Sequence, residues 1–303
     1  MTARPSPALA ETPSVMRTTG WADYELVDSG AGRKLERYGP FRVVRPEPQC
    51  LWTPRLSDDD WAAADATFDP EGEDDTGRWR FAKPIDARIP LAWRGVRFHG
   101  RFTAFRHLGF FPEQAANWTF IEEQVRSAGR PLKLLNLFGY TGVASLVAAA
   151  AGASVTHLDA SKRAIGWARE NAELSGVADR PIRWICEDAR RYVQREVRRG
   201  ARYDGIILDP PKYGRGPAGE VWRIYEDLPE LIAGCAELLS EDARFLIANV
   251  YAERLSGLAV GSLLREVLPG RGGRIDWGEL ALVEQGGERA VGLSFFARWS
   301  ADA

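Results

Sequence analysis

Residues 133–142 read Lys-Leu-Leu-Asn-Leu-Phe-Gly-Tyr-Thr-Gly, and the alanine-rich run 143–151 follows directly. The apolar start predicts a short buried strand, and the alanines predict a helix. Gly139 and Gly142 permit a tight turn and the close approach of a ligand at the helix N-terminus. The spacing is not Gly-x-Gly-x-x-Gly, so the dinucleotide fingerprint is absent. The turn therefore predicts either an ordinary strand-to-helix connection or a site for a cofactor without a pyrophosphate.

The strand-then-helix rhythm continues to the C-terminus. It predicts strands at 154–158, 182–185, 203–208 and 244–250, and helices at 114–128, 161–175, 190–199, 229–239 and 257–268. Two last strands, 278–283 and 291–299, flank Gly286-Gly287, which indicates a hairpin. Such a pattern predicts an α/β fold, with a doubly wound, mostly parallel, seven-stranded sheet and helices on both faces.

The chain before this region has a different composition. Residues 1–18 are rich in Pro, Ala, Ser and Thr, and we predict a disordered tail. Residues 19–110 contain short apolar or aromatic runs broken by Gly, Pro and Asp, which is typical of a smaller β-rich domain with hairpins. We assign this domain a possible role in substrate binding, and residues 111–303 to the α/β domain.

Composition excludes several classes of protein. The 303 residues are 45% hydrophobic and 27% charged, and we find no apolar run near the roughly 20 residues that span a bilayer. Three cysteines without a Cys-x-x-Cys pair argue against a disulfide framework or a zinc site. We therefore expect a cytoplasmic protein with no membrane partner and no metal. The oligomeric state is not predicted.

Acidic side chains follow the second and third strands of the α/β region. Asp159 is placed to accept hydrogen bonds from ribose hydroxyls, or to cap the next helix, a role that Ser161 also fits. Asp188 could meet the exocyclic amine of an adenine, or cap the helix that follows it. We extend the predicted ligand site to the adjoining Ser161 and Ala189.

The turn after the fourth strand is the most specific motif. It reads Asp209-Pro210-Pro211-Lys212-Tyr213 and follows the apolar Gly205-Ile-Ile-Leu208. Two prolines fix the backbone and remove two donors, which leaves carbonyl groups for a ligand. Asp209 adds a carboxylate at the carboxyl end of a central strand, where open α/β sheets place their active sites. We predict catalytic roles for residues 209–213 and a mobile flap at Gly214-Arg215-Gly216.

The net charge of −2 hides an uneven distribution. Residues 57–75 contain nine acids and no base, whereas residues 78–106 contain eight Arg or Lys against one acid. The basic stretch also carries Trp and Phe, which suits phosphate contact with base stacking. Ordinary strand alternation, with aromatics in the core and arginines in water, explains it equally. A second arginine cluster, 190–202, is interpreted as a solvated helix face.

These turns, in this order and spacing, resemble the class I S-adenosylmethionine-dependent methyltransferases. The segment Gly109-Phe-Phe-Pro-Glu-Gln114 with the later Asp-Pro-Pro-Lys-Tyr is more narrowly similar to the bacterial large-subunit rRNA methyltransferase family, over roughly residues 95–300. The resemblance implies a Rossmann-like fold and S-adenosyl-L-methionine as cofactor. It implies cofactor contacts at Phe111, Gln114, Asn136, Phe138, Gly139, Tyr140, Thr141, Gly142, Asp159, Asp188 and Asp209. We find no convincing RNA-binding PUA module, which many relatives carry, in the first 90 residues.

One departure from the family concerns cysteine. Relatives that methylate carbon 5 of cytosine use a cysteine thiolate in the fifth-strand turn or after the motif prolines. Here the fifth strand reads Phe245-Leu-Ile-Ala-Asn-Val-Tyr251. Cys186 and Cys235 are interpreted as buried and structural. We therefore expect direct in-line transfer to a nitrogen or oxygen nucleophile, without a covalent cysteine intermediate.

The resulting functional prediction is an enzyme that methylates RNA, specifically rRNA, at a nitrogen. Asp209 and a proline carbonyl would hold the acceptor, Tyr213 would stack on a flipped base, and Lys212 could contact a phosphate. A methyltransferase of a small molecule or protein is the alternative, which the net acidic charge favours. A nucleotide-binding oxidoreductase is a more remote alternative, because the dinucleotide fingerprint is missing.

Overall fold

The computed structural model describes residues 5–72, 76–251, 255–287 and 289–302. The chain divides into two compact units, neither of which is continuous in sequence. The first unit comprises residues 1–16, 116–280 and 293–303, and the second comprises residues 17–115 and 281–292. One junction between the units lies at residues 115 and 116, and the C-terminal hairpin contributes to both units.

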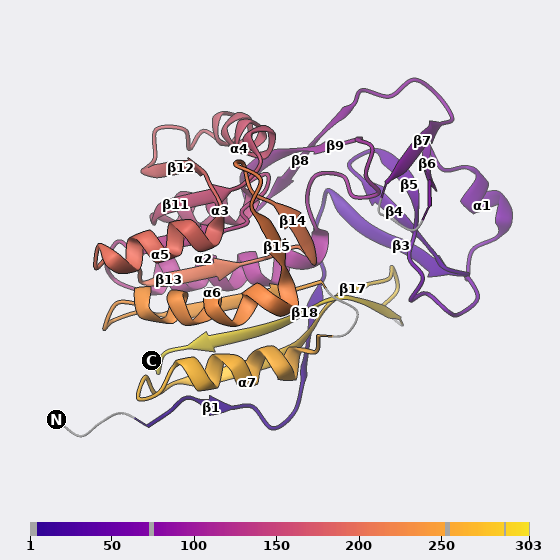
Figure 1. Cartoon of the computed structure of the whole chain (residues 1–303). Helices are drawn as coiled ribbons and strands as arrows, with labels where there is room; N and C mark the ends of the chain where they lie inside the picture. The colour runs from indigo at the N-terminus through magenta and orange to yellow at the C-terminus, as the bar shows by residue number, and fades with distance from the viewer. Residues whose placement is uncertain (1–4, 73–75, 252–254, 288, 303) are drawn as a thin grey trace. The chain divides into compact units, whose positions relative to one another are not determined.

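The first unit is a sheet covered by helices (Figure 1). Its strands are β1 (Ala8–Leu9), β2 (Ser14–Thr18), β10 (Lys133–Leu137), β11 (Ser154–Asp159), β12 (Ile182–Cys186), β13 (Gly205–Leu208), β14 (Tyr213–Arg215), β15 (Val221–Arg223), β16 (Phe245–Val250), β17 (Arg274–Val283) and β18 (Ala290–Ser300). Its helices are α2 (Ala115–Ser127), α3 (Val143–Ala151), α4 (Lys162–Leu174), α5 (Ala189–Arg198), α6 (Ile224–Leu238) and α7 (Gly257–Val267).

The strand order confirms the predicted fold class. The order is β1-β17-β18-β16-β13-β10-β11-β12, and β2 also pairs with β17, so the sheet has nine strands among the described residues. Strands β12, β11, β10, β13 and β16 pair in parallel, and β18 is antiparallel to β16. The seven strands from β12 to β17 form the predicted mostly parallel sheet, and β1 and β2 extend it.

The predicted disordered tail is wrong for the part of residues 1–18 that the structure describes. Strand β1 pairs in parallel with β17, with Ala8 opposite Arg274, and β2 pairs with the same strand. The Trp277 indole N–H donates to the carbonyl of Ala10 at 2.7 Å. The composition does not reveal these strands, because an edge strand is held by backbone hydrogen bonds, and every residue except proline can make these in full. Residues 1–4 lie outside the described residues.

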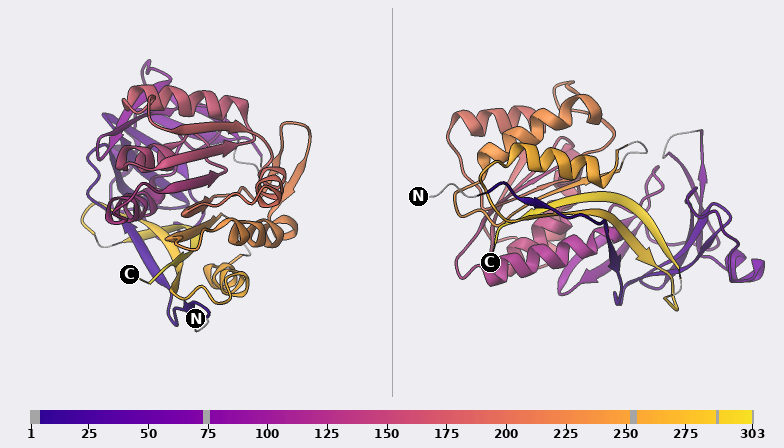
Figure 2. Two further views of the ribbon diagram at one scale, coloured as in Figure 1. Left: turned by 90° about the vertical axis from the view of Figure 1, so that its left-hand side faces the viewer. Right: turned by 90° about the horizontal axis from the view of Figure 1, so that it is seen from below.

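Each face of the sheet is packed by a different set of helices. Helices α5, α6 and α7 contribute to one apolar cluster, with Tyr192, Leu231 and Leu264 among its buried members. Helices α2 and α3 contribute to a second cluster, with Ile121 and Ala148 among its members. Figure 2 shows the helices lying on either side of the sheet. No helix among the described residues has both the length and the apolar character that a bilayer crossing requires.

The predicted elements of this unit agree closely with the structure. Strand β10 and helix α3 have the predicted bounds, and most other ends shift by one to a few residues. Helix α6 begins at Ile224, five residues before the predicted start at Pro229. Proline is common in the first turn of helices. Instead Pro229 lies inside α6, and Asp227 accepts the backbone N–H of Arg223 at 2.6 Å at the helix start.

The second unit is β-rich, as predicted. Its strands are β3 (Tyr24–Gly30), β4 (Arg33–Tyr38), β5 (Phe41–Pro46), β6 (Ala66–Pro70), β7 (Gly77–Phe81), β8 (Arg88–Trp93) and β9 (Val96–Arg101), with a short helix α1 (Asp58–Ala62) and a 3-10 turn η1 (Pro112–Gln114). The order of the main sheet is β3-β4-β5-β6-β7, and β8 pairs with β9. A fully buried carboxylate, Glu36, receives the guanidinium of Arg45 at 2.7 Å and the hydroxyls of Tyr24 and Tyr38.

The acidic and basic segments of the sequence pair with each other in the hairpin of β6 and β7. Arg80 forms an ion pair with Asp69 diagonally across the two strands, since Arg80 is directly opposite Thr67, and Arg78 lies 2.6 Å from Glu71. Lys83 lies 2.9 Å from Asp65. These three cations therefore already have acidic partners, which weakens the case for phosphate contact at this end of the basic segment. Residues 73–75 of the acidic segment lie outside the described residues.

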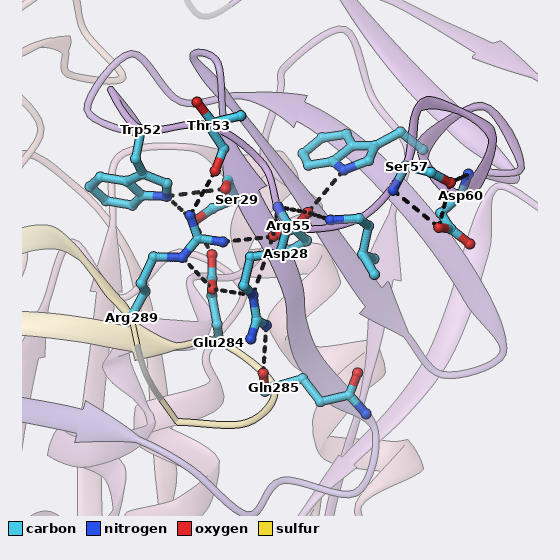
Figure 3. Close-up of polar contacts among 12 residues, drawn as sticks. Asp28, Ser29, Trp52, Thr53, Arg55, Ser57, Asp60, Glu284, Gln285 and Arg289 are labelled. Atoms are coloured by element: carbon cyan, nitrogen blue, oxygen red, sulfur yellow. Dashed lines mark hydrogen bonds and ion pairs between the residues drawn. The ribbon is translucent and has the colours of Figure 1, made fainter.

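Residues 281–292 join the second unit through a buried polar cluster (Figure 3). Arg289 lies 3.0 Å from Asp28 and 2.8 Å from Glu284, and it donates to the carbonyl of Thr53 at 2.9 Å. Glu284 also accepts the hydroxyl of Ser29. Burial alone raises the pKa of Asp28, but backbone N–H donors, including that of Leu56, hold this pKa below its usual value.

Candidate active site

The parallel strands of the first unit end at one edge of the sheet, and the predicted site residues lie there. Cys186 is opposite Asp159, and the last registered residues of the next strands are Leu137, Leu208 and Ala248, so Phe138, Asp209 and Asn249 follow directly at the same edge. Neighbouring strands are about 4.8 Å apart, so Asp159 and Asp209 lie about 10 Å apart with the turn after β10 between them. This is the edge at which open α/β sheets bind their ligands.

The turn after β10 has an unusual backbone. Phe138 and Tyr140 have positive φ angles of 57° and 49°, and Gly142 has a φ of 88°. Positive φ is uncommon for residues other than glycine, and such conformations concentrate at ligand sites. The backbone N–H of Gly142 closes the turn on the carbonyl of Gly139 at 2.9 Å. This backbone is consistent with a ligand site at the turn, and the role of the turn stays a prediction.

A buried, hydrogen-bonded group of three polar side chains supports this turn. Asn136 is buried, and its amide donates to the hydroxyl of Ser145 at 2.8 Å. Ser145 in turn lies 2.9 Å from Nδ1 of His157. A Cβ on Gly139 would lie 2.4 Å from the His157 ring, so only glycine fits there. Burial lowers the pKa of His157 to about 3, and the ring is neutral. Asn136 thus supports the turn with its side chain, and its contact with a cofactor stays a prediction.

Asp159 is bound to the same turn. Its carboxylate accepts the backbone N–H of Tyr140 at 2.9 Å and that of Ser161 at 2.8 Å. Ser161 caps α4, with its hydroxyl accepting the N–H of Ala164 at 3.2 Å. Burial raises the pKa of Asp159, while the two N–H donors lower it. Helix capping therefore belongs to Ser161, and Asp159 keeps acceptor capacity for a ligand hydroxyl.

The rest of the turn packs inward. Thr141 is buried, and its carbonyl accepts the side-chain amide of Asn171 at 3.0 Å. The ring of Phe138 lies against that of Trp222, with centroids 5.0 Å apart. These contacts hold the turn between α4 and the hairpin of β14 and β15.

Asp188 performs the capping role that the sequence left open. Its Oδ1 accepts the backbone N–H groups of Arg190 and Arg191 at 3.0 and 3.1 Å, at the start of α5. Its other oxygen takes neither of these bonds, so capping is compatible with a ligand contact. The adjoining Ala189 is buried in the core.

Arg190 is part of the site structure, contrary to its interpretation as a solvated residue. Its guanidinium lies 3.6 Å from Asp188 and 2.5 Å from Asp227, and it donates to the carbonyl of Val221 at 2.8 Å. The residue therefore links the start of α5 to the hairpin. A single arginine beside a helix cap carries no local pattern that would distinguish it from its exposed neighbours.

The turn after β13 is rigid. Pro210 is buried and Asp209 is half-buried, while Pro211, Lys212 and Tyr213 are exposed. The carbonyl of Pro211 accepts the indole N–H of Trp222 at 2.6 Å. This carbonyl is therefore engaged within the protein, so Pro210 is the proline whose carbonyl suits the predicted ligand role. The predicted mobile flap at 214–216 is instead part of the antiparallel hairpin of β14 and β15.

The cysteines lie away from Asp209 within the first unit. Cys235 is buried in α6, as predicted, and burial raises the pKa of its thiol well above the usual value. Cys186 is exposed at the end of β12, so its predicted burial is wrong. Three strand spacings, about 15 Å, separate β12 from β13. The described residues contain no group of His, Cys, Asp and Glu side chains placed to hold a metal ion.

Two predicted cofactor residues belong to the second unit. Phe111 is exposed, and Gln114 is buried at the end of η1. Their contacts with a cofactor stay a prediction. Sequence reasoning missed Trp222 and His157, because nothing in their local sequence shows which turns they would meet.

A family model described as S-adenosylmethionine-dependent methyltransferase matches residues 67–249. The chain belongs to this family. The match includes every strand-end residue described above, from Phe138 to Asn249. The cofactor of the methyltransferase is therefore S-adenosyl-L-methionine, and the half-buried Asp159 and the distorted turn after β10 suit an adenosine with its ribose hydroxyls.

Two curated relatives are methyltransferases of ribosomal RNA by name. Ribosomal RNA large subunit methyltransferase K of Neisseria meningitidis serogroup B is 32% identical over 226 residues, which cover 71% of this chain and 62% of that protein. Ribosomal RNA large subunit methyltransferase K/L of Shewanella frigidimarina is 29% identical over 157 residues, which cover 51% of this chain and 21% of that protein. This chain thus spans less than two thirds of the length of either relative.

Solved structures agree with the fold. A SAM-dependent methyltransferase from Agrobacterium tumefaciens is 50% identical, with a TM-score of 0.94, and the alignment covers 99% of this chain and 96% of that one. A protein named SMU.776, solved in complex with SAH, is 18% identical with a TM-score of 0.68, covering 93% of this chain and 76% of that one. The second likeness concerns the fold alone.

Proposed function

We propose that the methyltransferase methylates RNA, specifically ribosomal RNA, at a nitrogen atom by direct in-line transfer. The observation that carries the proposal is the placement of the turns after β10 and β13 at one edge of the sheet. The cofactor turn lies beside Asp209 and the exposed Lys212-Tyr213 pair, and the cysteine of the strand edge, Cys186, is three strands away. The names of the curated relatives support RNA as the acceptor.

When bound, S-adenosylmethionine supplies an activated methyl group on a sulfonium, so the protein's main task is to align the acceptor. Asp209 and the carbonyl of Pro210 would hold the acceptor nitrogen, whose lone pair forms the new bond to carbon. The carbon–sulfur bond breaks and its electron pair stays on sulfur. An amine acceptor, or a ring nitrogen that carries a hydrogen, then releases one proton to water, whereas a ring nitrogen with a free lone pair and no hydrogen releases none. Asp209 is close to solvent and suits either acceptor.

The test is a transfer experiment with the tritium-labelled cofactor. The full chain is incubated with total RNA from a strain that lacks its gene, and with RNA from the parent strain as control. We expect label in RNA from the deletion strain only, released on digestion as a nitrogen-methylated nucleoside. Label on protein or on a small molecule, with none in RNA, would overturn the proposal and favour the alternative acceptor class.

A further inference from the structure

We infer that the outer face of the β14–β15 hairpin is a binding site for single-stranded RNA next to the reacting nucleotide. This inference rests on the proposed function for the identity of its partner. The hairpin follows directly from the Asp209–Lys212 turn, so anything bound along it lies beside the site of transfer.

The hairpin has two different faces. Tyr213 is directly opposite Arg223, and Arg215 is opposite Val221, so these side chains share one face. Gly214 and the buried Trp222 form the other face. The inner face packs on the catalytic turn, and the outer face carries an aromatic ring with two arginines.

The outer face is exposed and cationic. Tyr213 is 52% exposed, the Arg223 side chain is 59% exposed, and Arg215 is also exposed. Residues 212–223 contain three cations and one acid, Glu220. That acid lies 2.6 Å from Arg191 of α5, which balances its charge. The pattern matches the needs of an unpaired strand, with a ring for base stacking and guanidinium groups for phosphates.

The hairpin is also held in place. On its inner face, the indole N–H of Trp222 donates to the carbonyl of Pro211. Arg190 donates to the carbonyl of Val221 at 2.8 Å. The tip closes with the N–H of Gly216 on the carbonyl of Glu220 at 2.8 Å. A fixed platform loses little conformational entropy when a strand binds, and it keeps a constant distance to Asp209.

Fluorescence anisotropy with a labelled oligoadenylate of about twelve nucleotides tests the site on the full chain, because stacking tolerates any base. The variants are Arg215→Gln, Arg223→Gln, Tyr213→Leu and Tyr213→Phe. The matched control is Arg199→Gln. Arg199 is 60% exposed and 3.2 Å from Glu196, just as Arg223 is 3.2 Å from Glu226, but it lies at the far end of α5.

Each hairpin arginine should contribute about 0.7 to the slope of log K against log salt, and Arg199→Gln should leave the slope unchanged. Tyr213→Leu should weaken binding about 5- to 100-fold, while Tyr213→Phe keeps the ring and stays close to the original affinity. Equal slopes for Arg223→Gln and Arg199→Gln, undiminished affinity of Tyr213→Leu, or no binding by the unaltered protein would overturn the inference.

The same experiment separates this inference from the proposed function, because it requires no methyl transfer. Hairpin-dependent binding without label transfer to any RNA would leave the hairpin site standing and overturn the proposed function. Label transfer to RNA, together with normal RNA binding by the hairpin variants, would leave the proposed function standing and overturn the hairpin site.

Discussion

Asp209 directly follows β13, which lies between β10 and β16 in the sheet. Asp209→Asn keeps the shape of the side chain and removes its charge. Because a small misplacement of the acceptor is costly, we expect kcat to fall about 100-fold, with little change in melting temperature. Transfer kinetics and thermal unfolding measure the two effects. Full activity in the variant would remove Asp209 from the catalytic role.

His157 makes stability depend on pH. Its pKa in the folded protein is about 3, well below the ordinary value of 6.5, because burial disfavours the charged ring. The unfolded chain therefore binds a proton at a higher pH than the folded chain. Stability from this residue is complete above pH 6.5 and is lost as the pH falls towards 3.

We expect the free energy of unfolding to fall by about 2–3 kcal/mol per such histidine between pH 6.5 and 4.5. His107, whose pKa burial lowers to about 4, contributes in the same direction. His157→Gln should remove its share of this dependence. Urea unfolding at several pH values is the measurement, and a variant with the pH dependence of the unaltered protein would contradict the assignment.

At the scale of single elements, the hairpin of β14 and β15 links the two halves of the site. Trp222 donates to Pro211 in the turn after β13 and lies against Phe138 in the turn after β10. We therefore assign Trp222 as a positioning residue. Trp222→Phe should lower kcat at least about tenfold while the KM for the cofactor changes less, because alignment depends on both turns.

Trp299→Phe is the matched control. Trp299 also donates a buried indole N–H to a backbone carbonyl, that of Gly272, at 2.9 Å. It pairs with Leu246, near the opposite end of β16 from the site. Both variants should lose about 1–3 kcal/mol of stability from the unpaired carbonyl, but only Trp222→Phe should lose turnover. Equal kcat values in the two variants would show that Trp222 is structural only.

At the scale of the whole molecule, the second unit depends on residues that are distant in sequence. Arg289 contacts Asp28 and Glu284, both of which are buried. Arg289→Met keeps the aliphatic stem but removes one positive charge that pairs with two buried carboxylates. We expect a loss of about 3 kcal/mol, measured by urea unfolding followed through tryptophan fluorescence.

Arg274→Met provides the comparison for this prediction. Arg274 lies 2.6 Å from Asp276 on β17, but its side chain is 65% exposed, so its loss should cost less than about 1 kcal/mol. Similar losses in the two variants would contradict a structural role for the buried cluster. The same cluster predicts that a fragment of residues 17–115 will not fold stably without residues 281–292.

Local sequence determined much of this protein. Periodicity located the strands and helices from β10 to α7, because each pattern follows from which face of one element is buried. Glycines and prolines located the turns after β10 and β13, since those residues constrain their own backbone. The same patterns predict that the carboxylates Asp159, Asp188 and Asp209 share one edge of a parallel sheet.

Tertiary structure alone decided which distant partners these turns would have. It paired Trp222 with Pro211, Arg190 with Asp227, and β1 with β17, and it brought residues 281–292 into the second unit. Such contacts are selected by burial and by the need to satisfy every buried polar group, which depend on the whole fold. A tryptophan or an arginine has the same local pattern whether it is a solvated residue or the support of a turn at the end of a strand.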